Sequence, residues 1–207
     1  LKRAIFAIGS TRVVLVDQLK AACLGADISF DGPDGVALAS IGAGVSEFGI
    51  LAASELVYHH SVRVGGDQMN WAIQGYLRRQ WNLGIGERTA EKLKLSFGGA
   101  EIMPGDESHS LTVAGRDLLN GVPKKSSINR RVVREAISEI VQTITDGFAT
   151  ALEMVPPELA GAILSKGIIL VGGGAELPNI DAVISRRLRL PVRIAPSPSL
   201  SVIRGMG

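Results

Sequence analysis

The first of two glycine-rich turns in the sequence is Ser40-Ile41-Gly42-Ala43-Gly44-Val45-Ser46-Glu47, and the predicted fold is built around it. It joins two apolar segments, Val36–Ile41 and Glu47–Ala53, which we predict to be strands. Its glycines allow a tight turn whose backbone can approach a phosphate or a nucleobase closely. For one such turn alone, an ordinary tight turn is the more frequent interpretation, because the spacing matches neither the Rossmann nor the Walker motif.

A second glycine turn follows another apolar run. Ile168–Val171 is predicted to be a buried strand, and it leads through Gly172-Gly173-Gly174-Ala175-Glu176 into a helix predicted over Leu177–Leu188. A helix N-terminus offers free N–H donors and a positive dipole to an anion. Because ligands sit beyond the carboxyl ends of strands in open α/β sheets, we predict that Val36–Ile41 and Ile168–Val171 share one sheet and that both turns open on the same edge.

The remaining chain alternates strands and helices, which predicts a largely parallel central sheet with one small inserted α+β lobe. Further strands and extended pieces are predicted at Val13–Val16, Leu56–Val64, Leu111–Val113, Gly121–Pro123 and Val192–Ala195. Further helices are predicted at Leu19–Leu24, from Asp67 as N-cap, at Glu87–Phe97 with Thr89 as a possible cap, at about 129–154, after Pro156-Pro157, and from Ser199.

Composition excludes several classes of protein. The chain of 207 residues is 46% hydrophobic, so it can bury a core and is not disordered. Cys23 is the only cysteine, which excludes a disulfide framework and indicates a reducing compartment. The 22 basic and 20 acidic residues nearly balance, so the charge does not predict a nucleic-acid partner. No apolar run approaches the roughly 20 residues that span a bilayer.

Classical catalytic and metal-binding patterns are absent from the sequence. His59 and His60 occupy adjacent positions of a predicted strand, so their rings point to opposite faces and cannot easily share a metal. No Cys/His group has metal-ligand spacing, and no serine sits in a nucleophile elbow. We therefore predict no metal site made by protein ligands. The group Glu91-Lys92-Leu93-Lys94 places opposite charges close together on a helix, which by itself is only a surface ion pair.

Taken together, several motifs occur in an order that is far more specific than any one of them. They are Val62-Arg63-Val64-Gly65-Gly66-Asp67, Tyr76-Leu77-Arg78-Arg79, Ile85-Gly86-Glu87-Arg88-Thr89-Ala90-Glu91, Pro104-Gly105-Asp106-Glu107, Gly121-Val122-Pro123, Pro156-Pro157-Glu158-Leu159-Ala160, Gly172-Gly173-Gly174-Ala175, Leu190-Pro191-Val192 and Arg204-Gly205. This order resembles the C-terminal half of the bacterial actin family of MreB and Mbl, over nearly the whole chain.

The resemblance implies an α/β fold of the actin-like, ribonuclease H-like ATPase class, and specifically its domain II with a small inserted α+β lobe. Subdomain IIA would comprise residues 1–66 and 128–207, and the inserted subdomain IIB residues 67–127. It also implies that ATP with Mg²⁺ binds between domain I and domain II. The nucleotide-binding residues would be Gly42, Ala43, Gly44 and Val45 at the phosphates, Glu91, Lys92, Leu93 and Lys94 at adenine and ribose, and Gly172, Gly173, Gly174 and Ala175 on the other side of the nucleoside.

Departures from the family pattern concern hydrolysis. Relatives usually read Asp-Ile-Gly-Gly-Gly-Thr-Thr-Glu, whereas this chain begins the motif with Ser40 and replaces the two threonines by Val45 and Ser46. The family's Glu-Glu-Pro is here Asp17-Gln18-Leu19. Gln18, with Asp17 beside it, would be the catalytic group by position; a glutamine can orient water but cannot act as a general base. Because position 40 is a serine, the chain lacks a carboxylate there that would hold a water molecule bound to Mg²⁺. We predict weak ATPase activity that is impaired here.

The resemblance further implies nucleotide-dependent, membrane-associated filaments of this protein that control rod cell shape and organise cell-wall synthesis. Partners would be further copies of the chain and proteins of wall synthesis and membrane morphogenesis, with no nucleic acid. Localisation would be cytoplasmic, at the inner face of the cytoplasmic membrane, with membrane contact through an N-terminal half absent from this chain. Two alternatives remain open: a sugar-kinase or chaperone-type ATPase of the same fold, and a non-hydrolysing interaction module.

Overall fold

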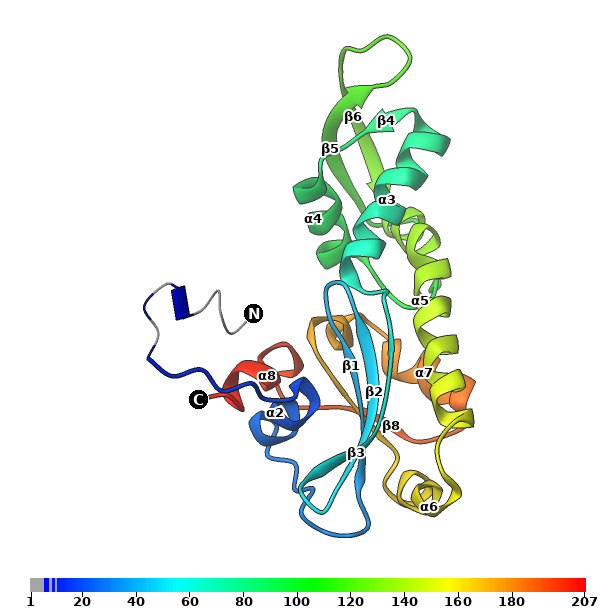
Figure 1. Ribbon diagram of the computed structural model, residues 1–207. Helices are drawn as coiled ribbons and strands as arrows, with labels where there is room; N and C mark the ends of the chain where they lie inside the picture. Colours follow the sequence, from blue (N-terminus) through cyan, green and yellow to red (C-terminus); the bar gives the residue numbers. More distant parts are fainter. Residues whose placement is uncertain (1–5, 8, 10) are drawn as a thin grey trace.

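A mixed five-stranded sheet forms the centre of the molecule in the computed structural model, which describes residues 6, 7, 9 and 11–207 (Figure 1). The strand order is β3-β2-β1-β7-β8. The strands are β1 (Val36–Ile41), β2 (Ser46–Ala52), β3 (Glu55–Val62), β7 (Ile168–Val171) and β8 (Val192–Ile194). The prediction of a largely parallel sheet is half right. β1, β7 and β8 are parallel, but β1–β2 and β2–β3 are antiparallel because the connections 42–45 and 53–54 are too short for a crossover.

The two faces of this sheet carry separate helical layers. Along β1, Ala37, Ala39 and Ile41 point into the core shared with α5 (Arg130–Glu153), α6 (Pro157–Lys166) and α7 (Ile180–Leu188). Val36 and Leu38 point to the opposite core, with α2 (Gln18–Gly25) and α8 (Ser201–Arg204). This alternation is what a strand covered on both faces requires. It also means that Ser40, next in the second series, faces α2.

A second, three-stranded antiparallel sheet lies in a lobe at the end of the molecule away from α6 (Figure 1). It consists of β4 (Leu83–Gly84), β5 (Ser110–Asp117) and β6 (Pro123–Asn129). The helices of the lobe are α3 (Gly66–Trp81) and α4 (Glu87–Phe97). The long helix α5 packs against both of them and also against β2 and β3, so it connects the lobe to the central sheet.

Helix α5 follows directly from its sequence. Apolar side chains at helical spacing, among them Val133, Ile137 and Ile144, are fully buried. Asn129 caps the first turn, its Oδ1 accepting a hydrogen bond from the Val132 N–H at 3.0 Å. The predicted helix over about 129–154 is therefore confirmed.

Other predicted elements need correction. Val13–Val16 forms no strand, and Val14 remains 65% exposed because no described strand pairs with this run. The caps of α3 and α4 are Gly65 and Gly86, so Asp67 and Thr89 lie within the first turns.

Two further boundaries differ. Gly121 and Val122 belong to the turn between β5 and β6, whose strands are longer than the short pieces predicted. The segment after β7 first forms a short 3₁₀ helix, η1 (Gly173–Glu176), and α7 begins only after Pro178. A second 3₁₀ turn, η2 (Pro198–Leu200), precedes α8.

Candidate functional site

The two glycine turns meet at one edge of the central sheet, as predicted. β1 and β7 are parallel neighbours, with Ser40 opposite Val171, so both strands end at the same edge of the sheet and their turns leave it in the same direction. A Cβ at Gly172, where φ is +85°, would lie 2.5 Å from the Ile41 carbonyl oxygen, and one at Gly174 would lie 2.1 Å from Ile41 Cγ2. Glycine at these positions therefore allows the second turn to pack directly on the end of β1.

The first turn is anchored by backbone hydrogen bonds. Gly42 N–H donates to the Val45 carbonyl at 2.9 Å, and the N–H groups of Gly66 and Asp67 donate to Gly42 and Ala43 at 3.0 and 2.8 Å. These bonds fix the turn against the start of α3. No acceptor in the described part of the chain takes the N–H groups of Ala43 and Gly44. Such free amides suit an anionic ligand.

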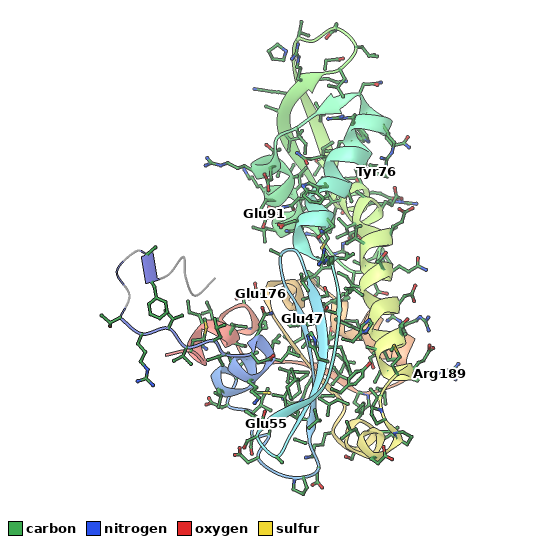
Figure 2. The ribbon with its side chains drawn as sticks, in the orientation of Figure 1. Glu47, Glu55, Tyr76, Glu91, Glu176 and Arg189 are labelled. Atoms are coloured by element: carbon green, nitrogen blue, oxygen red, sulfur yellow. The ribbon has the colours of Figure 1, made fainter. Side chains whose placement is uncertain are left out.

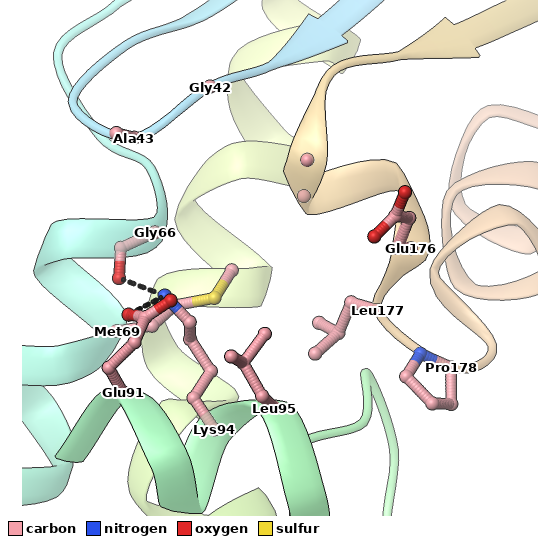
Figure 3. Close-up of a pocket in the computed structure, with 12 residues that line it drawn as sticks. Gly42, Ala43, Gly66, Met69, Glu91, Lys94, Leu95, Glu176, Leu177 and Pro178 are labelled. Atoms are coloured by element: carbon pink, nitrogen blue, oxygen red, sulfur yellow. Dashed lines mark hydrogen bonds and ion pairs between the residues drawn. The ribbon is translucent and has the colours of Figure 1, made fainter. Parts of the chain in front are cut away.

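Between the turns and α4 lies a cavity of about 340 Å³ (Figure 3). Its lining residues are Gly42, Ala43, Gly66, Met69, Glu91, Lys94, Leu95, Gly173, Gly174, Glu176, Leu177 and Pro178. Glycine backbone forms one side, and the remaining lining consists of the charged pair Glu91 and Lys94, the carboxylate of Glu176, and apolar Met69, Leu95, Leu177 and Pro178. This lining can hold a ligand that has an anionic part, a polar part and a flat apolar part.

The charged wall of the cavity is a small hydrogen-bonded network. Lys94 Nζ donates to Glu91 Oε2 at 2.7 Å and to the Gly66 carbonyl at 3.1 Å, which ties α4 to the start of α3. Asn70 Nδ2 donates to the same Glu91 oxygen at 2.6 Å. Partial burial raises the pKa of Glu91, but the hydrogen bonds from Lys94 and Asn70 outweigh burial and hold that pKa below its ordinary value.

Glu91 and Lys94, which the family resemblance implies at adenine and ribose, lie on one face of α4 and both line the cavity. The other two residues implied at this place do not line the cavity, since Lys92 is exposed and Leu93 is fully buried in the core of the lobe. Leu95 lines the cavity instead. Its i+4 relation to Glu91 is a signal that could have identified it.

Only some of the residues predicted in the two glycine turns line the cavity. Gly42, Ala43, Gly173 and Gly174 line the cavity, whereas Val45 is 39% exposed outside it. Residues that support or flank it are Gly44, whose Cβ would lie 4.0 Å from Asp67 Oδ2, Gly172, which packs on Ile41, and Ala175, which is fully buried. Residues that sequence reasoning missed are Gly66, Met69, Asn70, Leu95, Glu176, Leu177 and Pro178.

The residues predicted for hydrolysis lie on the α2 face of the same sheet edge. Asp17 caps α2, its Oδ1 accepting from the Leu19 N–H at 2.9 Å. Gln18 Nε2 donates to Ser40 Oγ at 3.3 Å, and Ser40 is fully buried. Gln18 and Ser40, two of the positions that depart from the family pattern, therefore touch each other and form a neutral pair.

The described residues, 6, 7, 9 and 11–207, contain no group of three or more His, Cys, Asp or Glu side chains placed to hold a metal ion. None of their helices has both the length and the apolar character needed to cross a bilayer.

This sheet order, with helical layers on both faces and a cavity beside two glycine turns, defines the actin-like class of α/β fold. The chain superposes on the MamK double helical filament structure with a TM-score of 0.70 over 92% of its length, at 18% identity, which shows the fold alone. It superposes on the crystal structure of MreB5 of Spiroplasma citri bound to ADP with a TM-score of 0.92 and 33% identity, covering 99% of this chain and 62% of that one.

Sequence comparisons agree with the fold. The sequence model of the MreB/Mbl protein family matches residues 1–207, and the chain belongs to that family. It is 38% identical to the cell shape-determining protein MreB of Escherichia coli K12 over 96% of this chain and 57% of the relative. It is 32% identical to the cell shape-determining protein Mbl of Bacillus subtilis 168 over 100% of this chain and 62% of the relative. The chain thus spans about three fifths of the length of these relatives.

Proposed function

We propose that this chain is the domain II part of an actin-like cell-shape protein that binds ATP with Mg²⁺ and assembles into filaments. The observation that carries the proposal is the meeting of both glycine turns with Glu91 and Lys94 around one cavity. In this proposal residues 1–66 and 128–207 form subdomain IIA, and residues 67–127 form subdomain IIB. Relatives support the ligand class, since the two MreB5 structures are of the ADP-bound and AMPPNP-bound protein.

The residues present fit a nucleoside phosphate. The free amides of Ala43 and Gly44 would bind phosphate oxygens. Glu91, whose Oε2 is already held by Lys94 and Asn70, would accept a hydrogen bond from the ribose through its other oxygen. Leu95 and Leu177 would pack against the base. When bound, Mg²⁺ neutralises phosphate charge, as phosphoryl transfer requires.

For hydrolysis, the chain's own contribution would be the positioning of water. Gln18 donates through Nε2 to Ser40, which leaves its Oε1 to accept a hydrogen bond from a water molecule. This glutamine can orient water but cannot remove its proton as a carboxylate can. We therefore propose weak ATPase activity. The Gln18–Ser40 contact also favours the second candidate, a relative that binds nucleotide without hydrolysing it and acts as an interaction module.

Family membership supports a proposal on the assembly, location and partners of the protein. We propose filaments of this protein at the inner face of the cytoplasmic membrane, acting with proteins of cell-wall synthesis and membrane morphogenesis. Membrane contact would come from residues outside this chain.

Sedimentation of the full-length protein, as its gene encodes it, tests this function. With ATP and Mg²⁺ we expect the protein to pellet, and without nucleotide we expect it to stay in the supernatant. Failure to pellet under all nucleotide conditions would contradict the filament proposal. Phosphate release that is stimulated by a small-molecule or peptide substrate, without assembly, would instead support a kinase-like or chaperone-like ATPase of the same fold.

A further inference from the structure

Glu176 lines the cavity but takes no part in the nucleotide contacts proposed above. It lies in η1, between β7 and α7, and its side chain is exposed. Glu91, on α4, reaches the same cavity from the lobe (Figure 2). The two carboxylates therefore approach the cavity from two different parts of the molecule, and Glu176 belongs to the side of the central sheet.

Glu176 carries the charge in the cavity wall that has no opposite charge beside it. The charged side chains of the lining are Glu91, Lys94 and Glu176, and the first two form an ion pair at 2.7 Å. Among the described residues, only the Ser199 hydroxyl donates a hydrogen bond to Glu176. The lining thus has a net negative charge. A nucleoside triphosphate, which is itself strongly anionic, is favoured here only when its phosphates lie away from this carboxylate.

The carboxylate lies at the end of the cavity away from the first glycine turn. Figure 3 shows Ala43 on one side, and Glu176 with Leu177 and Pro178 on the other. The free amide of Ala43, proposed for the phosphates, is therefore separated from Glu176. Leu177, proposed to pack against the base, directly follows Glu176 in the chain. The base is thus the part of the nucleotide that comes nearest to Glu176.

The Glu176 side chain is held in place by a second element. Ser199 Oγ donates to Glu176 Oε1 at 2.6 Å, a length typical of a charge-assisted hydrogen bond. Ser199 lies in η2, where the Pro198 carbonyl accepts from the Gly172 N–H at 2.8 Å. η2 therefore fixes both the second glycine turn and the carboxylate. An ionised carboxylate accepts through both oxygens, so Oε2 is left to accept from a ligand.

We infer that Glu176 determines the base specificity of the cavity, its Oε2 accepting a hydrogen bond from the exocyclic 6-amino group of adenine. This inference rests on the proposed nucleotide-binding function. A carboxylate accepts hydrogen bonds but cannot donate one, so it favours an amino group over the 6-oxo group of hypoxanthine at the same place. A site built to hydrogen-bond one group of a substrate rejects analogues that lack that group. Ser199 acts as a positioning residue for Glu176.

Calorimetric titration of the full-length protein with ATP, GTP and purine riboside triphosphate tests the inference. The last of these differs from ATP only by the absence of the 6-amino group. We expect ATP to bind about tenfold more tightly than this analogue, the effect of one hydrogen bond to a charged group. Glu176→Met, which keeps the side-chain length without a strong acceptor, should bring the two affinities to a ratio of about one.

Two sets of variants control for charge and for structure. Glu158→Met removes an equal charge from an exposed position in the first turn of α6, outside the cavity, and should leave the preference for ATP unchanged. Ser199→Ala should weaken that preference, because Glu176 is no longer fixed, whereas Ser199→Thr keeps the hydroxyl and should preserve it. A merely structural role would lower the affinities for ATP and for the analogue equally.

The outcomes separate the two proposals. An unmodified protein that binds none of the three nucleotides overturns the proposed function, and the inference with it. Equal affinities for ATP and the analogue, or a preference that survives Glu176→Met, overturns the inference alone. Tighter binding of GTP than of ATP also overturns it, because the carboxylate would then accept from the N1 and 2-amino groups of guanine. An unchanged preference in Ser199→Ala overturns the positioning role of Ser199.

Discussion

Two corners of one sheet edge differ in how they are built. The cavity corner uses glycine backbone and a satisfied pair, Glu91 with Lys94. The Ser40 corner, on the α2 face, holds a neutral Gln18–Ser40 contact and a carboxylate, Glu47, with one unpartnered buried oxygen. In the first corner the N–H groups of Ala43 and Gly44 and the buried Asn70 Oδ1 have no partner among the described residues, and in the second corner Glu47 Oε2 has none. We therefore expect substitutions in the two corners to affect the proposed ATP binding and the proposed hydrolysis independently.

The largest effect should come from restoring the charge of the Ser40 corner. We expect Ser40→Asp combined with Gln18→Glu to raise phosphate release about 10²–10³-fold, equivalent to about 3–4 kcal/mol in barrier height, because each change returns an electrostatic or water-positioning group. ATP affinity should change little, since the cavity corner is untouched. Phosphate release and equilibrium binding are measured on the same preparations. An unmodified protein that already releases phosphate as fast as the double variant would show that Gln18 and Asp17 suffice.

The next effect concerns stability at the contact between the turns. Gly172→Ala should lower the free energy of unfolding by about 3 kcal/mol, because alanine is strained at φ +85° and its Cβ would meet the Ile41 carbonyl at 2.5 Å. Gly173→Ala is the matched control, since a Cβ there meets nothing within 4 Å. Denaturant titration measures both. Equal stability of the two variants would mean that the turns do not pack as the structure has them.

The smallest effect is the acid sensitivity of the cavity wall. The pKa of Glu91 is held below its ordinary 4.5 in the folded protein. Its stabilising contribution is therefore fully present above pH 4.5 and is lost as pH falls through the lower, folded pKa. Glu91→Gln should make the unfolding temperature depend less on pH in this acidic range. Glu87→Gln, at an exposed residue of the same helix, should leave that dependence unchanged. The same pH dependence of the unfolding temperature between pH 3 and pH 6 in Glu91→Gln and in the unmodified protein would contradict this prediction.

Much of the fold could be predicted from local patterns, because each local pattern is reinforced by its neighbours. The runs at β1 and β7 are apolar throughout and end at glycine turns, and the structure pairs them in parallel as predicted. Val13–Val16 has the same apolar character but remains exposed. An apolar run gives a tendency to be buried, whereas burial itself requires a partner, and local sequence does not identify one.

The cavity could be predicted only in part. The family resemblance implied Glu91 and Lys94, and their spacing of three residues places both on one face of the helix. Asn70 lies 21 positions away from Glu91 and on another helix, so only the packing of α3 against α4 brings the two together. The cap positions were wrong for a local reason: Gly65 and Gly86 precede the polar residues that resemble caps. Glu47 was part of the quoted motif, but its unpartnered oxygen is a property of the folded sheet.

We expect the cavity between the glycine turns and α4 to bind ATP. Calorimetric titration of the full-length protein with ATP, in unmodified form and as Lys94→Ala and Lys92→Ala, measures this binding. Lys94 contacts Glu91 and Gly66 in the cavity wall, whereas Lys92, two residues away on the same helix, is exposed. We predict one ATP per chain, an affinity about tenfold lower in Lys94→Ala through the loss of a charge-assisted contact, and no change in Lys92→Ala. Absence of binding, or equal affinity for the two variants, would contradict the claim.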